Sequence, residues 1–129
     1  MARILVIDDD GDVRALLRIQ LENAGHEVRA ARDGSEGLAM QRDFDSEVVI
    51  TDIFMPEMEG VETIRELKEQ FPAVKVIVIS GGSRLAAGRR SFTARDLGIV
   101  AGELGVAAVL QKPFDNADLL RSVDSALQA

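Results

Sequence analysis

Five short apolar runs, each separated from the next by a helical pattern, constrain this chain more than any other feature. Most of the runs are continuous rather than alternating, as in strands that are covered on both faces. A regular alternation of strand and helix predicts a parallel sheet with helices on both sides. The expected strands span residues 4–7, 28–31, 48–51, 74–79 and 106–110.

Apolar side chains between these runs recur at intervals of three and four residues, which predicts helices with one buried face. Asp33 followed by Glu36 predicts a capping box at the second helix, and Asp115 is expected to cap the last. Gly60 is expected to let the chain turn into the third helix. The expected buried faces are Val13, Leu16, Leu17, Leu21 and Ala24; Val61, Ile64, Leu67 and Phe71; Leu97, Val100, Ala101 and Leu104; and Leu120, Val123 and Leu127.

We interpret residues 1–129 as one α/β domain, because the alternation runs through the whole chain without a repeat or a linker. This length suffices for one hydrophobic core. The predicted fold is a doubly wound, five-stranded parallel sheet of the flavodoxin-like (α/β)5 type, with strand order 2-1-3-4-5. Ligands of such sheets bind beyond the carboxyl ends of the strands, where the strand order reverses.

Composition excludes several classes of function. Cysteine is absent, so disulfides and thiolate metal sites are excluded. The net charge of -7, from 15 basic and 22 acidic residues, argues against direct nucleic-acid binding. Four arginines between residues 84 and 95 are interpreted as a solvated helix face or a partner-docking surface. No segment has the length of a membrane span or the form of a secretory signal, which predicts a cytoplasmic protein without membrane contact.

Polar side chains follow four of the five expected strands. The exception is the second strand, which ends in alanines and is expected at an edge of the sheet. The carboxyl ends of parallel strands meet at one edge, so these polar groups are expected to lie together. They are Asp8, Asp9 and Asp10, then Asp52, then Ser80, and finally Gln111 and Lys112.

Three of these aspartates, Asp8, Asp9 and Asp52, cannot all stay ionised at close range unless positive charge offsets them. Lys112 supplies one charge, and a divalent cation would supply the rest. Oxygen ligands without histidine or cysteine favour Mg²⁺. A magnesium ion beside a lysine and the Ser80 hydroxyl suits a phosphoryl group, which makes Asp52 a candidate nucleophile.

Each of these residues also has a structural interpretation when it is taken alone. A strand-end aspartate is more often a helix cap, and a single serine or lysine is more often a turn or surface residue. Asp10 and Asp12 are expected to cap and begin the first helix, and His26 is expected in a turn or at a strand edge. The joint placement of polar groups at four strand ends favours a site over coincidence.

Four segments resemble the receiver domain of bacterial response regulators. They are "ILVIDDD" at 4–10, "ITDIFMPEMEG" at 50–60, "VIVISGG" at 76–82 and "VLQKPF" at 109–114. The resemblance implies a two-component signalling protein rather than a metabolic enzyme. Its input would be a phosphohistidine on a sensor kinase or phosphotransfer protein. Its output would be a changed contact with a downstream protein or a fused output domain.

The resemblance also implies a role for each residue of the site. Asp52 would be the phosphoacceptor, and Lys112 and Ser80 would contact phosphoryl oxygens. The receiver would catalyse only its own phosphorylation and slow dephosphorylation. The family has a cis peptide before Pro113, which would aim the lysine inward.

Mg²⁺ would be bound by the side chains of Asp9 and Asp52, by the backbone carbonyl of Phe54, and by Asp8 through a water molecule. The chain departs from the family pattern at Val109, where an aromatic side chain is common. An aromatic swing on activation is therefore excluded at that position. The segment between the serine and the lysine is also longer than in short chemotaxis receivers.

Two alternatives fit some of the same residues. "ILVIDDDGDV" is similar to the signature of a haloacid-dehalogenase-type phosphatase, with Asp8 as nucleophile and Asp10 as acid. That alternative leaves 51–60 unexplained and lacks the acidic pair expected after Lys112. The other is a receiver-like binding module that works without phosphorylation, which the complete set of site residues argues against. An EF-hand is excluded because Val13 stands where its loop needs glycine.

Overall fold

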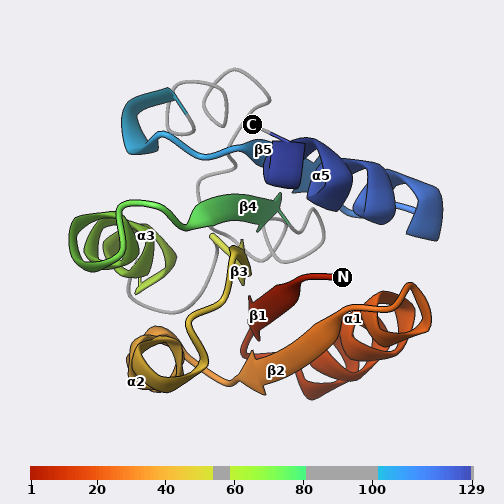
Figure 1. Ribbon diagram of the computed structural model, residues 1–129, viewed down its shortest axis with the longest axis horizontal. Coiled ribbons are helices and arrows are strands. Elements are labelled where there is room, and N and C mark those ends of the chain that lie inside the picture. Colours follow the sequence, from red (N-terminus) through yellow and green to blue (C-terminus); the bar gives the residue numbers. More distant parts are fainter. Residues whose placement is uncertain (54–58, 81–101, 129) are drawn as a thin grey trace, which may run out of the picture.

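The sheet has the predicted topology. The computed structural model describes residues 1–53, 59–80 and 102–128. Within these ranges, five parallel strands form one sheet in the order β2-β1-β3-β4-β5 (Figure 1). The strands are β1 (Arg3–Ile7), β2 (Glu27–Ala31), β3 (Val48–Asp52), β4 (Lys75–Ser80) and β5 (Ala108–Gln111).

Helices cover both faces of the sheet, as the continuous apolar runs predict. Figure 1 shows α1 and α5 on one side of the sheet and α2 and α3 on the other. Successive side chains of β1 alternate between two buried clusters, with Ile4 and Val6 in one and Leu5 and Ile7 in the other. The described helices are α1 (Gly11–Asn23), α2 (Gly34–Phe44), α3 (Glu59–Gln70) and α5 (Asn116–Gln128).

The predicted caps of α2 and α5 are confirmed. At α2, the Asp33 side chain accepts a hydrogen bond from the Glu36 amide at 2.8 Å. The Glu36 carboxylate accepts one from the Arg32 amide at 3.0 Å, one residue earlier than in a strict capping box. At α5, Asp115 accepts a hydrogen bond from the Asp118 amide at 2.8 Å.

Removal of the α2 cap gives the first testable prediction. Asp33→Ala is expected to lower the free energy of unfolding by about 1 kcal/mol, because the Glu36 amide loses its acceptor. Asp33→Asn keeps an acceptor oxygen and is expected to stay close to the parent protein. Urea unfolding followed by far-ultraviolet circular dichroism measures both variants. Equal losses in the two variants would contradict a capping role.

The predicted buried face of α1 is partly wrong. Leu17 and Leu21 are buried, but Leu16 is 55% exposed and Ile19 is 56% exposed. Leu16 and Leu17 are adjacent, so they point about 100° apart around the helix, and a helix on a sheet buries only one side. The sequence placed both leucines on the buried face. The structure leaves Leu16 and Ile19 as an apolar patch on the surface of α1.

The rotation of α5 also differs from the prediction. The buried side chains are Leu119, Val123 and Ala126, whereas Leu120 is only partly buried. Leu127 is 36% exposed. Both sets have helical spacing and share Val123, so periodicity alone could not choose between them.

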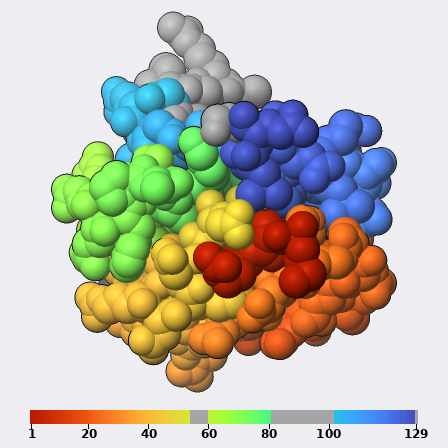
Figure 2. Space-filling model, in the orientation of Figure 1, coloured from red at the N-terminus to blue at the C-terminus, as the bar shows by residue number. Residues whose placement is uncertain are grey.

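Some sequence predictions lie outside the described residues. These are the Phe54 carbonyl, parts of the segments 50–60 and 76–82, the four arginines and most of the fourth helix. Residues 102–104 are helical and are followed by Gly105, whose φ is 69°. Over the described ranges, no helix combines the length and the apolar character that a membrane crossing needs. Figure 2 shows the N-terminal residues at the surface, where Met1 is 97% exposed.

Candidate metal and phosphoryl site

The register of the sheet brings the predicted site residues to one edge. In the β1–β3 pair, Ile7 lies opposite Thr51, so the next residues of the two strands, Asp8 and Asp52, lie side by side. Strand order reverses between these two strands, because β1 connects outward to β2 while β3 begins the other half of the sheet. The acidic residues therefore lie at the topological switch point, where ligands of this fold bind.

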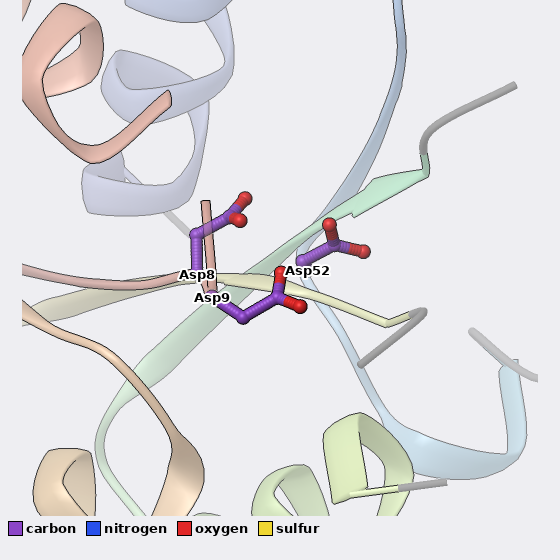
Figure 3. A group of neighbouring side chains, drawn as sticks. All are labelled: Asp8, Asp9 and Asp52. Atoms are coloured by element: carbon purple, nitrogen blue, oxygen red, sulfur yellow. The ribbon is translucent and has the colours of Figure 1, made fainter. Parts of the chain in front are cut away.

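Three carboxylates converge at this edge. One oxygen from each of Asp8, Asp9 and Asp52 lies within 4.8 Å of the others. Figure 3 shows the Asp9 side chain reaching toward Asp52, with Asp8 beside them. Asp8 and Asp52 are each only 1% exposed, while Asp9 is exposed. The structure thus combines two buried acids with one that solvent reaches.

Lys112 lies between the two buried acids. Its Nζ atom is 3.8 Å from Asp8 Oδ2 and 3.8 Å from Asp52 Oδ2. The backbone places it there: the Lys112 amide donates a hydrogen bond to the Ser80 carbonyl at 2.8 Å. The peptide before Pro113 is cis, as the resemblance implies. Ser80 is buried at the end of β4, one residue beyond the partner of Asp52 in the β3–β4 register.

Asp8 is held in one orientation and is costly to ionise. Its Oδ1 accepts a hydrogen bond from the Asp10 amide at 2.9 Å. Burial raises the pKa of Asp8 to about 6, and the charges of Asp52 and Asp9 add to the rise. The Asp10 amide and Lys112 act in the opposite direction without cancelling the burial effect. In the described part of the chain, Asp8 Oδ2 has no hydrogen-bond partner. Lys112 Nζ lies 3.8 Å away, which is close enough for an ion pair but too far for a hydrogen bond.

These observations fit a divalent cation. Among the described residues, three carboxylates face one ammonium group, which leaves an excess of negative charge when all three acids are ionised. A buried carboxylate oxygen without a hydrogen bond is unfavourable unless another positive group meets it. The donors are all oxygen atoms, which suits Mg²⁺ better than a transition metal.

Two contacts of Asp8 were not predicted from the sequence. Asp10 was expected only as a cap, and it does cap α1, with its side chain accepting from the amides of Asp12 and Val13. Its own amide also orients Asp8, and no residue type signals a contact made by a backbone amide. The second contact comes from Arg14, whose Nη1 donates to the Asp8 carbonyl at 2.7 Å. An arginine in a first helical turn gives no sequence signal of this kind.

Comparison with known proteins agrees with this geometry. The sequence model of the response regulator receiver domain matches residues 4–124. The chain belongs to the response regulator receiver family. This receiver has the acidic cluster and the sheet order that the resemblance implied, and the assignment leaves the phosphatase alternative without support.

Relatives extend over the whole receiver. It is 34% identical to the response regulator receiver protein CpdR of Brucella abortus, over 100% of this chain and 99% of that protein. It is also 34% identical to the DNA-binding transcriptional regulator NtrC of Azospirillum brasilense, but the chain spans only 24% of NtrC. A solved receiver domain from Clostridium thermocellum superposes with a TM-score of 0.83 at 32% identity, covering 99% of this chain and 95% of that one.

Proposed function

We propose that this receiver accepts a phosphoryl group on Asp52 from a phosphohistidine and thereby switches its contacts with a partner. One observation carries the proposal. The buried Asp52 carboxylate lies in a cluster with two further acids and 3.8 Å from the Lys112 ammonium group. A site built only for stability would not gather three acids around one lysine at the ligand-binding edge of the sheet.

The transfer is a displacement at phosphorus. An Asp52 carboxylate oxygen attacks the phosphorus atom, and the bond from phosphorus to the histidine nitrogen breaks. The electron pair of that bond leaves with the imidazole, and Asp52 becomes an acyl phosphate. Lys112 is close enough to pair with a phosphoryl oxygen while it remains near Asp52, so it would stabilise the charge that spreads over these oxygens. Hydrolysis of the acyl phosphate by water would end the signal.

The metal ligands are proposed to be Asp9 and Asp52 by side chain, Phe54 by its carbonyl, and Asp8 through water. When bound, Mg²⁺ would neutralise charge on the phosphoryl group during transfer. Ser80 would donate its hydroxyl to a second phosphoryl oxygen, from the end of the neighbouring strand. Val109 lies in β5 opposite Val78 and is partly buried, so any coupling from the serine must use aliphatic packing there.

The phosphoryl donor is proposed to be a sensor kinase or a phosphotransfer protein that docks beside α1. A surface hollow adjoins Lys112 and is lined mainly by apolar groups of α1 and of the turn after β5, including Leu16 and Phe114. Because a donor histidine must approach Asp52, its surrounding surface must contact this edge of the receiver. The downstream partner would be a separate protein or a fused output domain.

A phosphorylation assay with a small donor tests the proposal. The protein is incubated with acetyl phosphate and Mg²⁺, and its intact mass is measured. The parent protein and Asp124→Asn, which removes an exposed acid of α5, are expected to gain one phosphoryl group. Asp52→Asn and a parent sample in excess chelator are expected to gain none.

Each alternative gives a different result in the same assay. A receiver-like module that works without phosphorylation would show no adduct in the parent protein. A phosphatase would release phosphate from small esters over many turnovers, in a reaction that depends on Asp8. An adduct that persists in Asp52→Asn would place the acceptor elsewhere and would refute the assignment of Asp52.

A further inference from the structure

We infer that Arg14 is a positioning residue for the acidic site: its guanidinium holds the β1–α1 turn so that Asp8 faces the cation position. The inference rests on the proposed function, because it concerns the same metal site. Arg14 belongs to α1 and would not touch the cation or the phosphoryl group. It would act through the backbone of Asp8.

The contacts of Arg14 enclose the turn between β1 and α1. Its side chain donates to the Asp8 carbonyl at 2.7 Å, and its amide donates to the Asp10 carbonyl at 3.1 Å. A Cβ atom placed on Gly11 would lie 3.4 Å from Arg14 Nη2, so the guanidinium passes close to that glycine. The side chain thus reaches back over the turn instead of extending into solvent, and it is half-buried there.

Together with the contact from Arg14, the Asp10 amide leaves only one oxygen of Asp8 without a hydrogen bond in the described ranges. The carbonyl is used by Arg14 and Oδ1 is used by the Asp10 amide. The remaining carboxylate oxygen, Oδ2, is buried without a hydrogen bond in the described ranges and lies in the acidic cluster. Two fixed contacts therefore leave one oxygen directed at the position where positive charge is needed.

A charged hydrogen bond to a carbonyl is stronger than a neutral one, and 2.7 Å is at the short end of its range. Without it, the turn would depend on amide contacts alone, and Asp8 and Asp9 would sample more orientations. Outer contacts of this kind typically alter metal affinity by about 10- to 100-fold when they are removed. Because Asp8 is expected to act through water, the lower end of that range applies, about tenfold.

Mg²⁺ affinity measured by calorimetry tests this role. Arg14→Met is expected to bind Mg²⁺ about tenfold more weakly than the parent protein. Arg18→Met is the matched control, because Arg18 lies one turn further along α1 and pairs with Glu22 on the exposed surface. It is expected to bind Mg²⁺ as the parent protein does. Tryptophan fluorescence cannot replace calorimetry, since the chain contains neither tryptophan nor tyrosine.

A second readout separates positioning from a general loss of stability. The Asp10 amide donates to Asp8, so its proton chemical shift in metal-free protein should change in Arg14→Met and not in Arg18→Met. Far-ultraviolet circular dichroism verifies that each variant is folded. Arg14→Gln is a second variant that shortens the side chain, and glutamine has a helix propensity similar to that of arginine. Arg14→Lys keeps a cationic donor and is expected to recover part of the affinity.

The outcomes distinguish this inference from the proposed function. Equal Mg²⁺ affinities in Arg14→Met and Arg18→Met, with the parent protein binding normally, would overturn the positioning role and leave the proposed function standing. A lysine variant no better than methionine would also overturn it. A parent protein that binds no Mg²⁺ would refute the proposed metal site itself, and the inference with it.

Discussion

Asp8→Asn is expected to raise the free energy of unfolding of the metal-free protein at neutral pH by about 1–3 kcal/mol. The side chain is 1% exposed, and its pKa is raised from 3.8 to about 6. At about 1.4 kcal/mol per unit, that rise means that the ionised carboxylate costs the folded state up to about 3 kcal/mol. Asparagine removes the charge and keeps an oxygen that can accept the Asp10 amide hydrogen bond.

The pH dependence follows from the direction of the shift. A carboxyl whose pKa is raised by folding is more protonated in the folded protein, so folding is favoured at low pH. This contribution is fully present below about pH 3.8 and is lost as the pH rises through about 6. The difference in free energy of unfolding between Asp8→Asn and the parent protein should therefore be near zero below about pH 3.8 and reach its full size above about pH 6.

Mg²⁺ should reverse the order of the two proteins. A cation that binds only the folded state stabilises it by mass action, and the parent protein has the full acidic cluster. Urea unfolding in chelator and in Mg²⁺, across the pH range, measures both effects by circular dichroism. Asp124→Asn controls for the loss of one surface charge. A destabilised Asp8→Asn in chelator at neutral pH would show that the buried carboxylate is not under electrostatic strain.

The sequence predicted the order of the helices and strands correctly, but it predicted their first and last residues less accurately. The covered parallel sheet was predictable because the apolar runs are continuous, and the polar strand ends mark its functional edge. β3, β4 and β5 each end one residue later than predicted, at Asp52, Ser80 and Gln111, and β5 also begins two residues later than predicted. Ladder hydrogen bonds are made by the backbone, so a polar side chain need not end a strand. The rotation of α5 could not be predicted, because two sets of side chains share the same helical period.

In the site, too, the residues were predictable but their orientation was not. Asp8, Asp9, Asp52 and Lys112 were predicted from their places after strands, and the structure brings them together. The orientation of Asp8 could not be predicted, because it depends on a backbone amide and on the direction that Arg14 takes. A sequence specifies which groups reach an edge of the sheet. Their hydrogen bonds depend on backbone geometry that residue types do not encode.

Gly60→Ala is expected to lower the free energy of unfolding by about 2–3 kcal/mol, at the upper end of overpacking costs. The sequence predicts that this glycine lets the chain turn into the third helix, but it lies in the first turn of α3 and has no positive φ. A Cβ atom there would lie 2.5 Å from the Ile53 carbonyl oxygen and 2.7 Å from that of Asp52. Both neighbours are backbone atoms, so relief requires α3 to move away from the end of β3.

That movement should also disturb the site, because the strand end that must shift carries Asp52. Gly60→Ala is therefore expected to slow phosphorylation by acetyl phosphate as well as to lower stability, even in protein that remains folded. Gly102→Ala is the matched control, since a Cβ atom there meets nothing within 4 Å and the residue is helical. In that variant the helix propensity of alanine should leave stability unchanged or raise it by up to about 1 kcal/mol. If both alanine variants unfold at the same urea concentration as the parent protein, α3 can leave β3 freely, and the close approach is not what requires glycine at position 60.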